Sequence, residues 1–480
     1  MSRRCKANML DELRSLQHEE GRFVGDVIFD DDQERSGEDF KDCVCTGILV
    51  SGFGEDVPAA VRAEAVDRAI DSGTLLVDKS HWGIIRVQGE DRLRFLHNHG
   101  TNAFEGTSKG SVVPTCFTTN QGRVIDFVEA VVLEDEVRVL CSPQRWERAL
   151  ARMDKFMFPL DRTTVSSLSD ETAVFSLAGP GAAGILSTMG CEKLPAPGRA
   201  NEWEFSGEKV IVMCHSRPVT KGNGAAITPE GSLSARGMSE RRGEGAKDGI
   251  CAEYTMLLPS SVAMSMWSVL SGQSSLVVAG EREWQYLRVK QGLPSPGNEL
   301  TVKYNPLEAG LWHAVHFDKG CYVGQETISR VNAYKNVNLA LYGIEFEQGS
   351  SGEVSRGEGL LVDGTQDRAG VVTSLMDPEM SPRCRGLAYI RAQAGGTGLK
   401  VMTKLSGIRG TVVDVPYPSR SEAESACPPS LEKRLEGEED TAELSRLEDE
   451  RAKEKARKAA KVAALEKKLE ALKARKSKGS

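Results

Sequence analysis

Residues 319–326 bring a cation, a thiol, a phenol, an amide and a carboxylate into one short run, K-G-C-Y-V-G-Q-E. Gly320 and Gly324 lie between these groups, and glycine allows a sharp turn and a close approach of the backbone to a ligand. A cation beside a cysteine lowers the pKa of the thiol and increases its thiolate character. We therefore expect Cys321 to be a reactive, candidate catalytic thiol. We expect Lys319 to lower the pKa of that thiol or to hold an anion.

The other polar groups of this run suit the recognition of a flat ring. Gln325 offers an amide and Glu326 a carboxylate, which together match the donor and acceptor edge of a heterocycle. With Tyr322 and the two glycines they are candidate ligand-binding residues, although they also suit a role in shaping the turn. A simpler alternative stays open: the run is a tight turn between strands, with Cys321 buried as a small apolar side chain.

Two runs resemble a known family. The run at 319–326 resembles the hallmark K-G-C-Y-x-G-Q-E of the folate-binding YgfZ-type proteins, and N-P-L-E-A-G-L at 305–311 is similar to the N-P-x-E-A-G-L segment of their superfamily. That superfamily includes the glycine-cleavage T-protein, a tetrahydrofolate-dependent aminomethyltransferase. The resemblance extends, with gaps, from about His81 to Tyr417, and it is strongest to the plastid branch, which shares the S-H-x-G-x-I-R-V, F-L-H-N and V-P-Y pieces. It implies tetrahydrofolate or a derivative as the cofactor.

The resemblance adds three candidate ligand-binding residues. The Gln121-Gly122-Arg123 turn lies beside the folate cavity in the superfamily, which points to Arg123. The aminomethyltransferases carry two adjacent aspartates shortly after this turn, whereas Asp126 stands alone here. We weigh a functional Asp126 equally against a satisfied polar group at a strand edge. Arg288 matches the arginine of an R-x-x-x-G helix end, where its forked side chain suits a carboxylate or phosphate or, equally, an internal salt bridge.

One folate-recognition element of the superfamily has no equivalent here. The aminomethyltransferases place a T-G-Y-T-G-E-type run, whose glutamate reads the pterin, where this chain has residues 216–250. These residues are rich in Gly, Ser, Arg and Pro, so we expect a disordered surface insertion. Glu230-Gly231 is the nearest remnant of the run. Its loss and the single Asp126 argue against aminomethyl transfer.

Histidine and cysteine spacing gives little sign of a metal site. His81, His97 and His99 fall close together, but no clean i,i+4 pair with an acid accompanies them, so we expect hydrogen-bonded histidines and no metal. The eleven cysteines are scattered, and only Cys43 and Cys45 lie close together. This spacing is neither a zinc nor a disulfide framework, and it favours free thiols in a reducing compartment.

Hydrophobic patterning predicts the elements that must position these residues. Apolar runs and alternation predict strands at 75–78, 81–87, 124–133, 138–141, 173–178 and 254–258, and helical spacing predicts helices at 58–70, 144–157, 182–189, 260–270 and 284–292. Short strands separated by Gly-rich breaks then predict a small barrel: 339–346, 359–362, 369–375, 386–390, 400–405 and 410–415. The predicted fold class is α+β, with an aminomethyltransferase-like folate-binding body, a C-terminal β-barrel and a charged helical tail.

The predicted domain organisation has four parts. These are an N-terminal extension (1–75), a folate-binding domain (76–335, with the insertion at 216–250), a barrel domain (336–420) and a charged, partly helical tail (421–480). Residues 432–450 carry nine acids and three bases, and residues 451–480 carry twelve bases and three acids. We expect a solvated tail, with non-specific attraction to RNA or an anionic membrane as the alternative.

Composition bounds the class of protein. The 480 residues are 40% apolar and 27% charged, which is typical of a soluble globular protein with a polar appendage. No apolar run is long enough for a transmembrane helix, and the net charge of −8 argues against a specific nucleic-acid partner. The basic residues 1–6 are soon followed by acids, so there is no clear transit peptide. The resemblance suggests the chloroplast, with the mitochondrion or cytosol as alternatives.

Three functions follow from the resemblance. The first is a tetrahydrofolate-binding protein that supports assembly or repair of iron–sulfur clusters, with assembly factors or client enzymes as partners. The second is a folate-dependent aminomethyl or one-carbon transferase. The third is a non-catalytic scaffold of the same fold. The cysteine context of residues 319–326 favours the first function.

Overall fold

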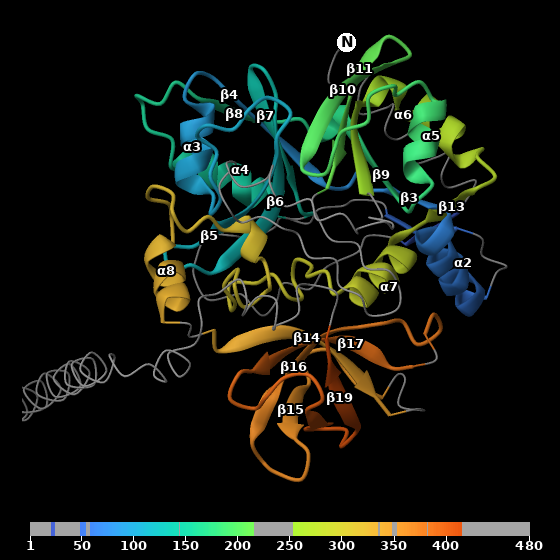
Figure 1. Ribbon diagram of the computed structural model, residues 1–480, viewed down its shortest axis with the longest axis vertical. Coiled ribbons are helices and arrows are strands. Elements are labelled where there is room, and N and C mark those ends of the chain that lie inside the picture. The colour runs from blue at the N-terminus through green and yellow to red at the C-terminus, as the bar shows by residue number, and fades with distance from the viewer. Residues whose placement is uncertain are drawn as a thin grey trace, which may run out of the picture. The chain divides into compact units, whose positions relative to one another are not determined.

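The computed structural model describes residues 58–143, 145–215, 253–334, 337–347, 353–381 and 383–414, and the backbone of 21–24 and 49–53. The predicted insertion at 216–250 and the predicted tail at 421–480 lie outside the described residues, as does most of the predicted N-terminal extension. Within the described part, the strands form mainly antiparallel sheets with helices packed on them, which confirms the α+β class (Figure 1).

A five-stranded antiparallel sheet carries the first half of the body. Its strands lie in the order β5 (Val112–Thr118), β6 (Val124–Val132), β7 (Glu136–Cys141), β4 (Gly83–Gln88) and β8 (Thr164–Ser167). Helices α3 (Arg92–His99) and α4 (Trp146–Lys155) pack on it, with Phe95 and Met153 in the shared core. Every residue of β6 is buried, so this strand is covered on both faces.

A six-stranded sheet carries the second half. Its order is β10 (Arg199–Phe205), β11 (Glu208–Cys214), β12 (Glu253–Pro259), β9 (Thr172–Ala178), β3 (Thr74–Asp78) and β13 (Leu276–Ala279), with β3 and β13 parallel. Helices α5 (Ala182–Thr188) and α6 (Ser260–Ser271) share a core around the buried Trp267.

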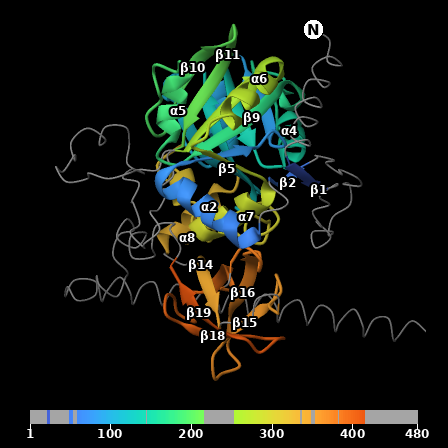
Figure 2. The same cartoon turned by 90° about the vertical axis from the view of Figure 1, so that its right-hand side faces the viewer.

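Helices α2 (Ala59–Ser72) and α7 (Glu281–Gln291) lie side by side (Figure 2), both against β13, and α2 also packs on β3. Val66 of α2 and Leu287 of α7 belong to one buried cluster with Leu75 of β3. Helix α2 and the start of β3 are therefore part of one core.

The two sheets share an apolar layer. Ile84 and Leu140 of the five-stranded sheet are buried in one cluster with Val174 and Leu257 of the six-stranded sheet. Face-to-face packing of this kind buries the inner side chains of both sheets. It leaves the outer faces for the helices, as Figure 1 shows.

The predicted barrel is confirmed as a closed, six-stranded one. Its order is β14 (Leu339–Phe346), β17 (Arg385–Arg391), β16 (Arg368–Leu375), β15 (Gly359–Val362), β18 (Lys400–Thr403) and β19 (Arg409–Val413), which pairs back with β14. A Cβ at Gly370 would lie 2.1 Å from the carbonyl oxygen of Tyr389, so the strands approach closely at this glycine.

The segment between α7 and β14 contains η2 (Trp312–Ala314) and α8 (Gln325–Ala333). Two smaller features are η1 (Ser169–Glu171) and the antiparallel pair β1 (Gly21–Val24) and β2 (Leu49–Phe53). Within the described ranges, no helix has both the length and the apolar character that a membrane span requires. The 319–326 run occupies the end of a loop and the first turn of α8.

Candidate functional site

Lys319 points inward, toward the C-terminal end of α3. Its Nζ donates hydrogen bonds to the backbone carbonyl oxygens of Gly100 (2.7 Å), Asn102 (2.8 Å) and His97. An ammonium group has three N–H donors, so these carbonyls occupy it fully. Burial lowers the pKa of Lys319 to about 7, whereas the carbonyl dipoles and the Tyr322 ring, 4.8 Å away, stabilise the charged form. The expectation that Lys319 holds an anion is wrong for this geometry, because its donors are used inside the protein.

Two glycines let the motif loop lie against the turn between β5 and β6. Gly324, with φ of 85°, is the residue before α8, and a Cβ there would lie 2.6 Å from the carbonyl oxygen of Thr119. Gly122 has φ of 68°, and its Cβ would lie 3.1 Å from the carbonyl oxygen of Gly324. Thr118 Oγ1 donates to the carbonyl oxygen of Val323 at 2.6 Å. Gly324 therefore serves a close contact between two backbone segments.

Cys321 is exposed, whereas the other described cysteines are buried: Cys116, Cys141, Cys191, Cys214 and Cys384. The alternative in which Cys321 packs as a small apolar side chain is therefore wrong. A position in the core of a sheet would have shielded the thiol, but the loop places Cys321 on the surface. The preceding Gly320 lies next to His97, since a Cβ at Gly320 would be 3.6 Å from His97 Nε2. Solvent reaches this side chain without any opening of the fold.

The remaining motif residues face the protein or the solvent. Tyr322 is buried, burial raises the pKa of its hydroxyl, and that hydroxyl has no hydrogen-bond partner among the described residues. The Gln325 amide donates to the carbonyl oxygen of Lys319 at 3.4 Å, and the exposed Glu326 pairs with Arg330 at 2.7 Å, one helical turn on. Gln325 shapes the loop, and Glu326 lies on the outer face of α8.

The N-P-L-E-A-G-L segment forms a capped turn. The Asn305 side-chain oxygen accepts hydrogen bonds from the N–H groups of Leu307 and Glu308, each at 2.9 Å. The Glu308 carboxylate in return accepts the Asn305 N–H at 2.9 Å, which is the reciprocal pattern of a capping box. Arg123 donates to Glu308 at 3.3 Å and to the carbonyl oxygen of Lys303 at 2.9 Å. Arg123 thus joins the β5–β6 turn to this segment.

A cavity lies where α7 meets the β3–β4 loop, strand β6 and the segment after α7. Its volume is about 80 Å³, which is room for several water molecules. Drug-sized ligands occupy about 300 Å³ or more, so such a ligand would extend through the mouth. Three aromatic side chains line it together with a set of polar ones: Trp82, Phe127 and Trp284, then His81, Ser142, Glu281, Gln285, Arg288, Ser295 and Asn298.

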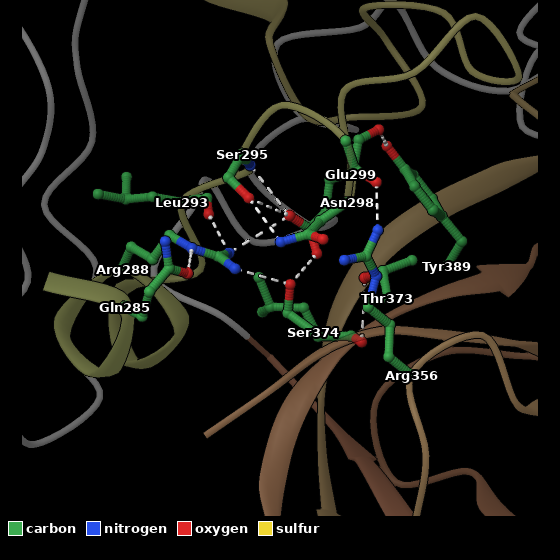
Figure 3. Close-up of polar contacts among 12 residues, drawn as sticks. Gln285, Arg288, Leu293, Ser295, Asn298, Glu299, Arg356, Thr373, Ser374 and Tyr389 are labelled. Atoms are coloured by element: carbon green, nitrogen blue, oxygen red, sulfur yellow. Dashed lines mark hydrogen bonds and ion pairs between the residues drawn. The ribbon is translucent and has the colours of Figure 1, made fainter. Parts of the chain in front are cut away.

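Arg288 forms one wall of this cavity and an internal ion pair (Figure 3). Its Nη1 lies 3.3 Å from the Glu299 carboxylate, and its Nη2 donates to Ser374 of β16 at 2.9 Å. Ser374 donates in turn to Glu299 at 2.6 Å. The Arg288 Nε donates to the side-chain oxygen of Gln285. Of the two roles weighed for Arg288, the structure gives it the internal salt bridge, which ties α7 to the barrel.

Asp126 is buried in β6 and only half satisfied. Its Oδ2 accepts the Ser142 N–H at 3.0 Å, whereas its Oδ1 has no hydrogen-bond partner in the described part of the chain. Burial raises the pKa of Asp126 to about 6, although the bond from Ser142 opposes this shift. Ser142 lines the cavity, and so does Phe127, the residue that follows Asp126 in β6. Asp126 is therefore not the fully satisfied strand-edge group that was one of the two expectations.

A buried ion pair stands behind the aromatic wall of the cavity. Lys79 donates to Glu253 at 2.8 Å, and both side chains are almost completely buried. The Lys79 ammonium also lies 4.1 Å from the ring centre of Trp284 and 5.5 Å from that of Trp82. The contact with the aromatic faces fixes both rings. Sequence reasoning missed Lys79, because a single lysine after a strand gives no distinctive signal.

Buried polar side chains also connect the two sheets. His215 contacts Glu129 of β6 through Nδ1 at 2.8 Å and Thr255 of β12 through Nε2 at 2.7 Å. Thr255 and Ser176 share a 2.6 Å hydrogen bond. The signal was present in the sequence, since Glu129 and Asp126 are the two acids of a strand that is otherwise apolar. A charge in such a strand needs a buried partner.

The three clustered histidines have separate surroundings. His97 Nδ1 accepts the N–H groups of Phe104 and Glu105, each at 3.3 Å, and His99 packs on Phe95 with ring centres 4.3 Å apart. Burial lowers the pKa of His99 to about 4. His81 lines the cavity. In the part of the chain that the structure describes, no group of His, Cys, Asp or Glu side chains is arranged to hold a metal ion.

The structure thus separates the predicted site residues into two places. Arg288 lies in the cavity wall, and Asp126 is joined to it through Ser142. The residues of the 319–326 run do not line this cavity. The cavity residues that sequence reasoning missed are Trp82, Trp284, Glu281 and Gln285.

Comparison with known proteins relates both the sequence and the fold to one superfamily. Residues 40–215 match the model of the GCVT N-terminal domain. At1g60990, a chloroplastic protein of Arabidopsis thaliana, is 33% identical over 365 residues, which are 76% of this chain and 75% of that protein. The aminomethyltransferase of Rubrobacter xylanophilus is 27% identical over 376 residues, 77% of this chain and 90% of the relative. The aminomethyltransferase T structure from Bartonella henselae superposes with a TM-score of 0.61 at 18% identity, covering 80% of this chain and 95% of that one, so it shares the fold.

Proposed function

The chain belongs to the aminomethyltransferase-like superfamily of the glycine-cleavage T-protein, and from this premise we propose that it binds a reduced folate, tetrahydrofolate or a derivative, in the cavity beside α7. The lining of the cavity carries the proposal. Trp82, Phe127 and Trp284 offer aromatic faces for a flat ring, while Glu281 and Gln285 offer an acceptor and a donor at one side.

The residues present fit the ring of such a cofactor in polarity. The cavity volume of about 80 Å³ is too small for a whole folate, so the benzoyl-glutamate part would lie in the mouth. Asp126, with one oxygen that lacks a partner among the described residues, accepts the N–H of the cavity residue Ser142 with its other oxygen. A buried polar atom of this kind is often satisfied by a ligand or water. A bound reduced folate would carry a one-carbon unit.

Within this function we place support of iron–sulfur cluster assembly or repair. The supporting observation is Cys321, an exposed thiol on a loop that Lys319 and Gly324 hold in place. Cysteine thiolates are the usual protein ligands of iron–sulfur clusters and exchange readily with other thiols. Partners that carry or receive clusters could reach this thiol from solution. A non-catalytic scaffold would have no need for it.

Folate-dependent aminomethyl or one-carbon transfer is the second candidate. Two of the relatives compared are aminomethyltransferases, and a carboxyl group with a pKa of about 6, as at Asp126, suits general acid–base chemistry. Against it, the sequence carries a single acid where the aminomethyltransferases carry two. We therefore expect no replacement of the T-protein in a reconstituted glycine-cleavage assay, measured as methylene transfer to tetrahydrofolate.

A plastid location is part of the proposal. Its support is the chloroplastic relative from Arabidopsis thaliana, which matches three quarters of each chain. Import of the full chain, fused to a fluorescent protein, into isolated chloroplasts and mitochondria tests the location.

Calorimetric titration with 5-formyltetrahydrofolate, without added metal, tests folate binding. We expect saturable binding with a Kd of about 1 mM or tighter, which corresponds to a binding free energy of about 4 kcal/mol or more. Binding should also quench tryptophan fluorescence, since Trp82 and Trp284 line the cavity, and Trp284→Leu should reduce both signals. Absence of saturation at millimolar folate would overturn the proposal.

A further inference from the structure

Glu281 holds a special position in the cavity wall. It lies in the first turn of α7 and lines the cavity with Trp284 and Gln285, three and four residues further along the same helix. This spacing places the three side chains on one face of a helix. Trp82 of the β3–β4 loop lines the same cavity. A carboxylate and two indole side chains thus line the same cavity.

The Gln285 amide fixes the Glu281 carboxylate as a hydrogen-bond acceptor. The Gln285 nitrogen donates to Glu281 Oε1, and its oxygen accepts the Arg288 Nε–H. An arginine can only donate, so the amide cannot turn round without placing its NH₂ group against another donor. Arg288 itself is held by Glu299 at 3.3 Å and Ser374 at 2.9 Å. The chain of bonds from the barrel to α7 therefore preorganises this carboxylate, as Figure 3 shows for its Arg288 end.

The charge of Glu281 is not used in an ion pair within the described residues, although other charges near the cavity are. Lys79 is paired with Glu253 at 2.8 Å and Arg288 with Glu299 at 3.3 Å. Burial raises the pKa of Glu281, and the more distant charges of Arg288 and Lys79 only partly oppose this shift. Placing a carboxylate beside aromatic walls costs free energy unless a partner compensates it. A ligand with paired N–H donors would provide that compensation.

We propose that Glu281 is the specificity-determining carboxylate of this site, and that it accepts hydrogen bonds from the amino group and adjacent ring N–H of a flat heterocycle bound against the aromatic lining of the cavity. The 2-aminopyrimidinone edge of a reduced pterin has this pair of donors, and a carboxylate binds such a pair in a bidentate manner. The inference rests on the proposed folate binding and adds to it the residue that selects the ring. The sequence resemblance would put a ring-reading carboxylate within residues 216–250. The inference instead places it on α7.

The test compares Glu281→Gln with wild type by calorimetric titration of 5-formyltetrahydrofolate. Gln keeps the size and removes the charge, and loss of a charged hydrogen-bonded pair should weaken binding about 10- to 100-fold. The control is Glu147→Gln, which changes a glutamate in the first turn of α4, a helix that does not line the cavity; its affinity should equal that of wild type. Equal melting temperatures show that the variants are folded.

A second ligand separates recognition of the ring edge from general effects. A folate analogue with a methyl group in place of the 2-amino group lacks one of the two donors. It should bind wild type about 10-fold or more weaker than the parent folate, and Glu281→Gln should lose this preference. If Glu281→Gln unfolds, Glu281→Asp, which keeps the charge and shortens its reach, should show a reduced preference in the same comparison.

The outcomes distinguish this inference from the proposed function. Folate binding by wild type with equal affinity and equal preference in Glu281→Gln would overturn the role of Glu281 and leave folate binding in place. Absence of binding by wild type would overturn both. Weaker binding of both ligands by the same factor, with the preference kept, would show that Glu281 supports the cavity without recognising the ring edge, and would also overturn the inference.

Discussion

Lys319 donates a 2.7 Å hydrogen bond to the backbone carbonyl oxygen of Gly100, the residue that follows α3. This bond and the two beside it join the motif loop to the C-terminal end of a helix, where carbonyl dipoles favour a positive charge. The charge of Lys319 is used to hold the loop, and Cys321, two residues on, is presented at the surface. The lysine therefore anchors the loop that carries the thiol.

Lys319→Met should destabilise the protein by about 2–3 kcal/mol, because three backbone carbonyls lose their donor while the loop stays partly buried. Urea denaturation measures the change in the free energy of unfolding. Lys155→Met, at an exposed position on α4, is the control and should leave the midpoint unchanged. An unchanged midpoint for Lys319→Met would show that the ammonium does not hold the loop.

Gly324→Ala tests the close contact between the motif loop and the β5–β6 turn. The added Cβ would lie 2.6 Å from the carbonyl oxygen of Thr119, at a φ of 85°, so we expect a loss of about 3 kcal/mol or more. Gly106→Ala is the matched control, since Gly106 has φ of 79° but nothing within 4 Å of an added Cβ. It should cost only about 1 kcal/mol, from backbone strain alone. Equal melting temperatures for both variants would contradict the contact.

The sequence predicts those elements whose pattern is local. The strand predicted at 339–346 is β14, with the same bounds, because alternation and Gly-rich breaks mark the barrel strands. By contrast, α8 was missed: Gly324 suggests a turn, yet its positive φ makes it the residue that starts the helix. Helix α7 begins at Glu281 and not at 284, because the Glu283 carboxylate accepts the Gly280 N–H at 2.8 Å and caps the first turn.

The candidate site is less predictable because it is built from distant segments. Resemblance identified Arg288, but its pairing with Glu299 and Ser374 depends on how the barrel meets α7. Glu281, Trp284 and Gln285 have the spacing of one helix face, so a search for polar and aromatic residues on α7 would have found them. Their common cavity with residues of β6 and the β3–β4 loop follows from tertiary packing, which local patterns do not contain.

Asp126→Asn should show a pH-dependent gain in stability relative to wild type. Burial raises the pKa of Asp126 from 3.8 to about 6, so between these values the folded state binds more protons than the unfolded state. Wild-type stability therefore falls as pH rises through this window, by about 3 kcal/mol in total. Asn does not titrate, so the variant should gain about 2–3 kcal/mol on wild type between pH 4 and pH 7.

Urea denaturation of both proteins at pH 4, 5, 6 and 7 measures this difference. Asp135→Asn, in the exposed turn between β6 and β7, is the control, because its carboxyl group stays in water. The difference in the free energy of unfolding between Asp126→Asn and wild type should change over this pH range. If it stays constant, the surroundings of Asp126 do not disfavour its charged form.

Cys321→Ser should separate the thiol from the folate cavity. Cys321 is exposed and does not line the cavity, so the variant should keep the melting temperature and the folate affinity of wild type. Iodoacetamide labelling of the native protein, followed by peptide mass spectrometry, should modify Cys321 before the buried Cys116, Cys141 and Cys384, because labelling requires an accessible thiolate. Labelling of these buried cysteines at the same rate would contradict the exposed position.

The same variant decides whether the thiol serves the cellular function. Serine is nearly isosteric with cysteine but forms no thiolate at neutral pH and takes no part in thiol exchange. In cells that lack the native protein, Cys321→Ser should fail to restore the activity of iron–sulfur enzymes, while Trp284→Leu should fail through lost folate binding with its thiol intact. A mixture of the two variants tests whether both features must lie in one chain, and we expect no restoration. Full restoration by Cys321→Ser alone would remove the thiol from the function and leave a folate-binding protein whose exposed cysteine is incidental.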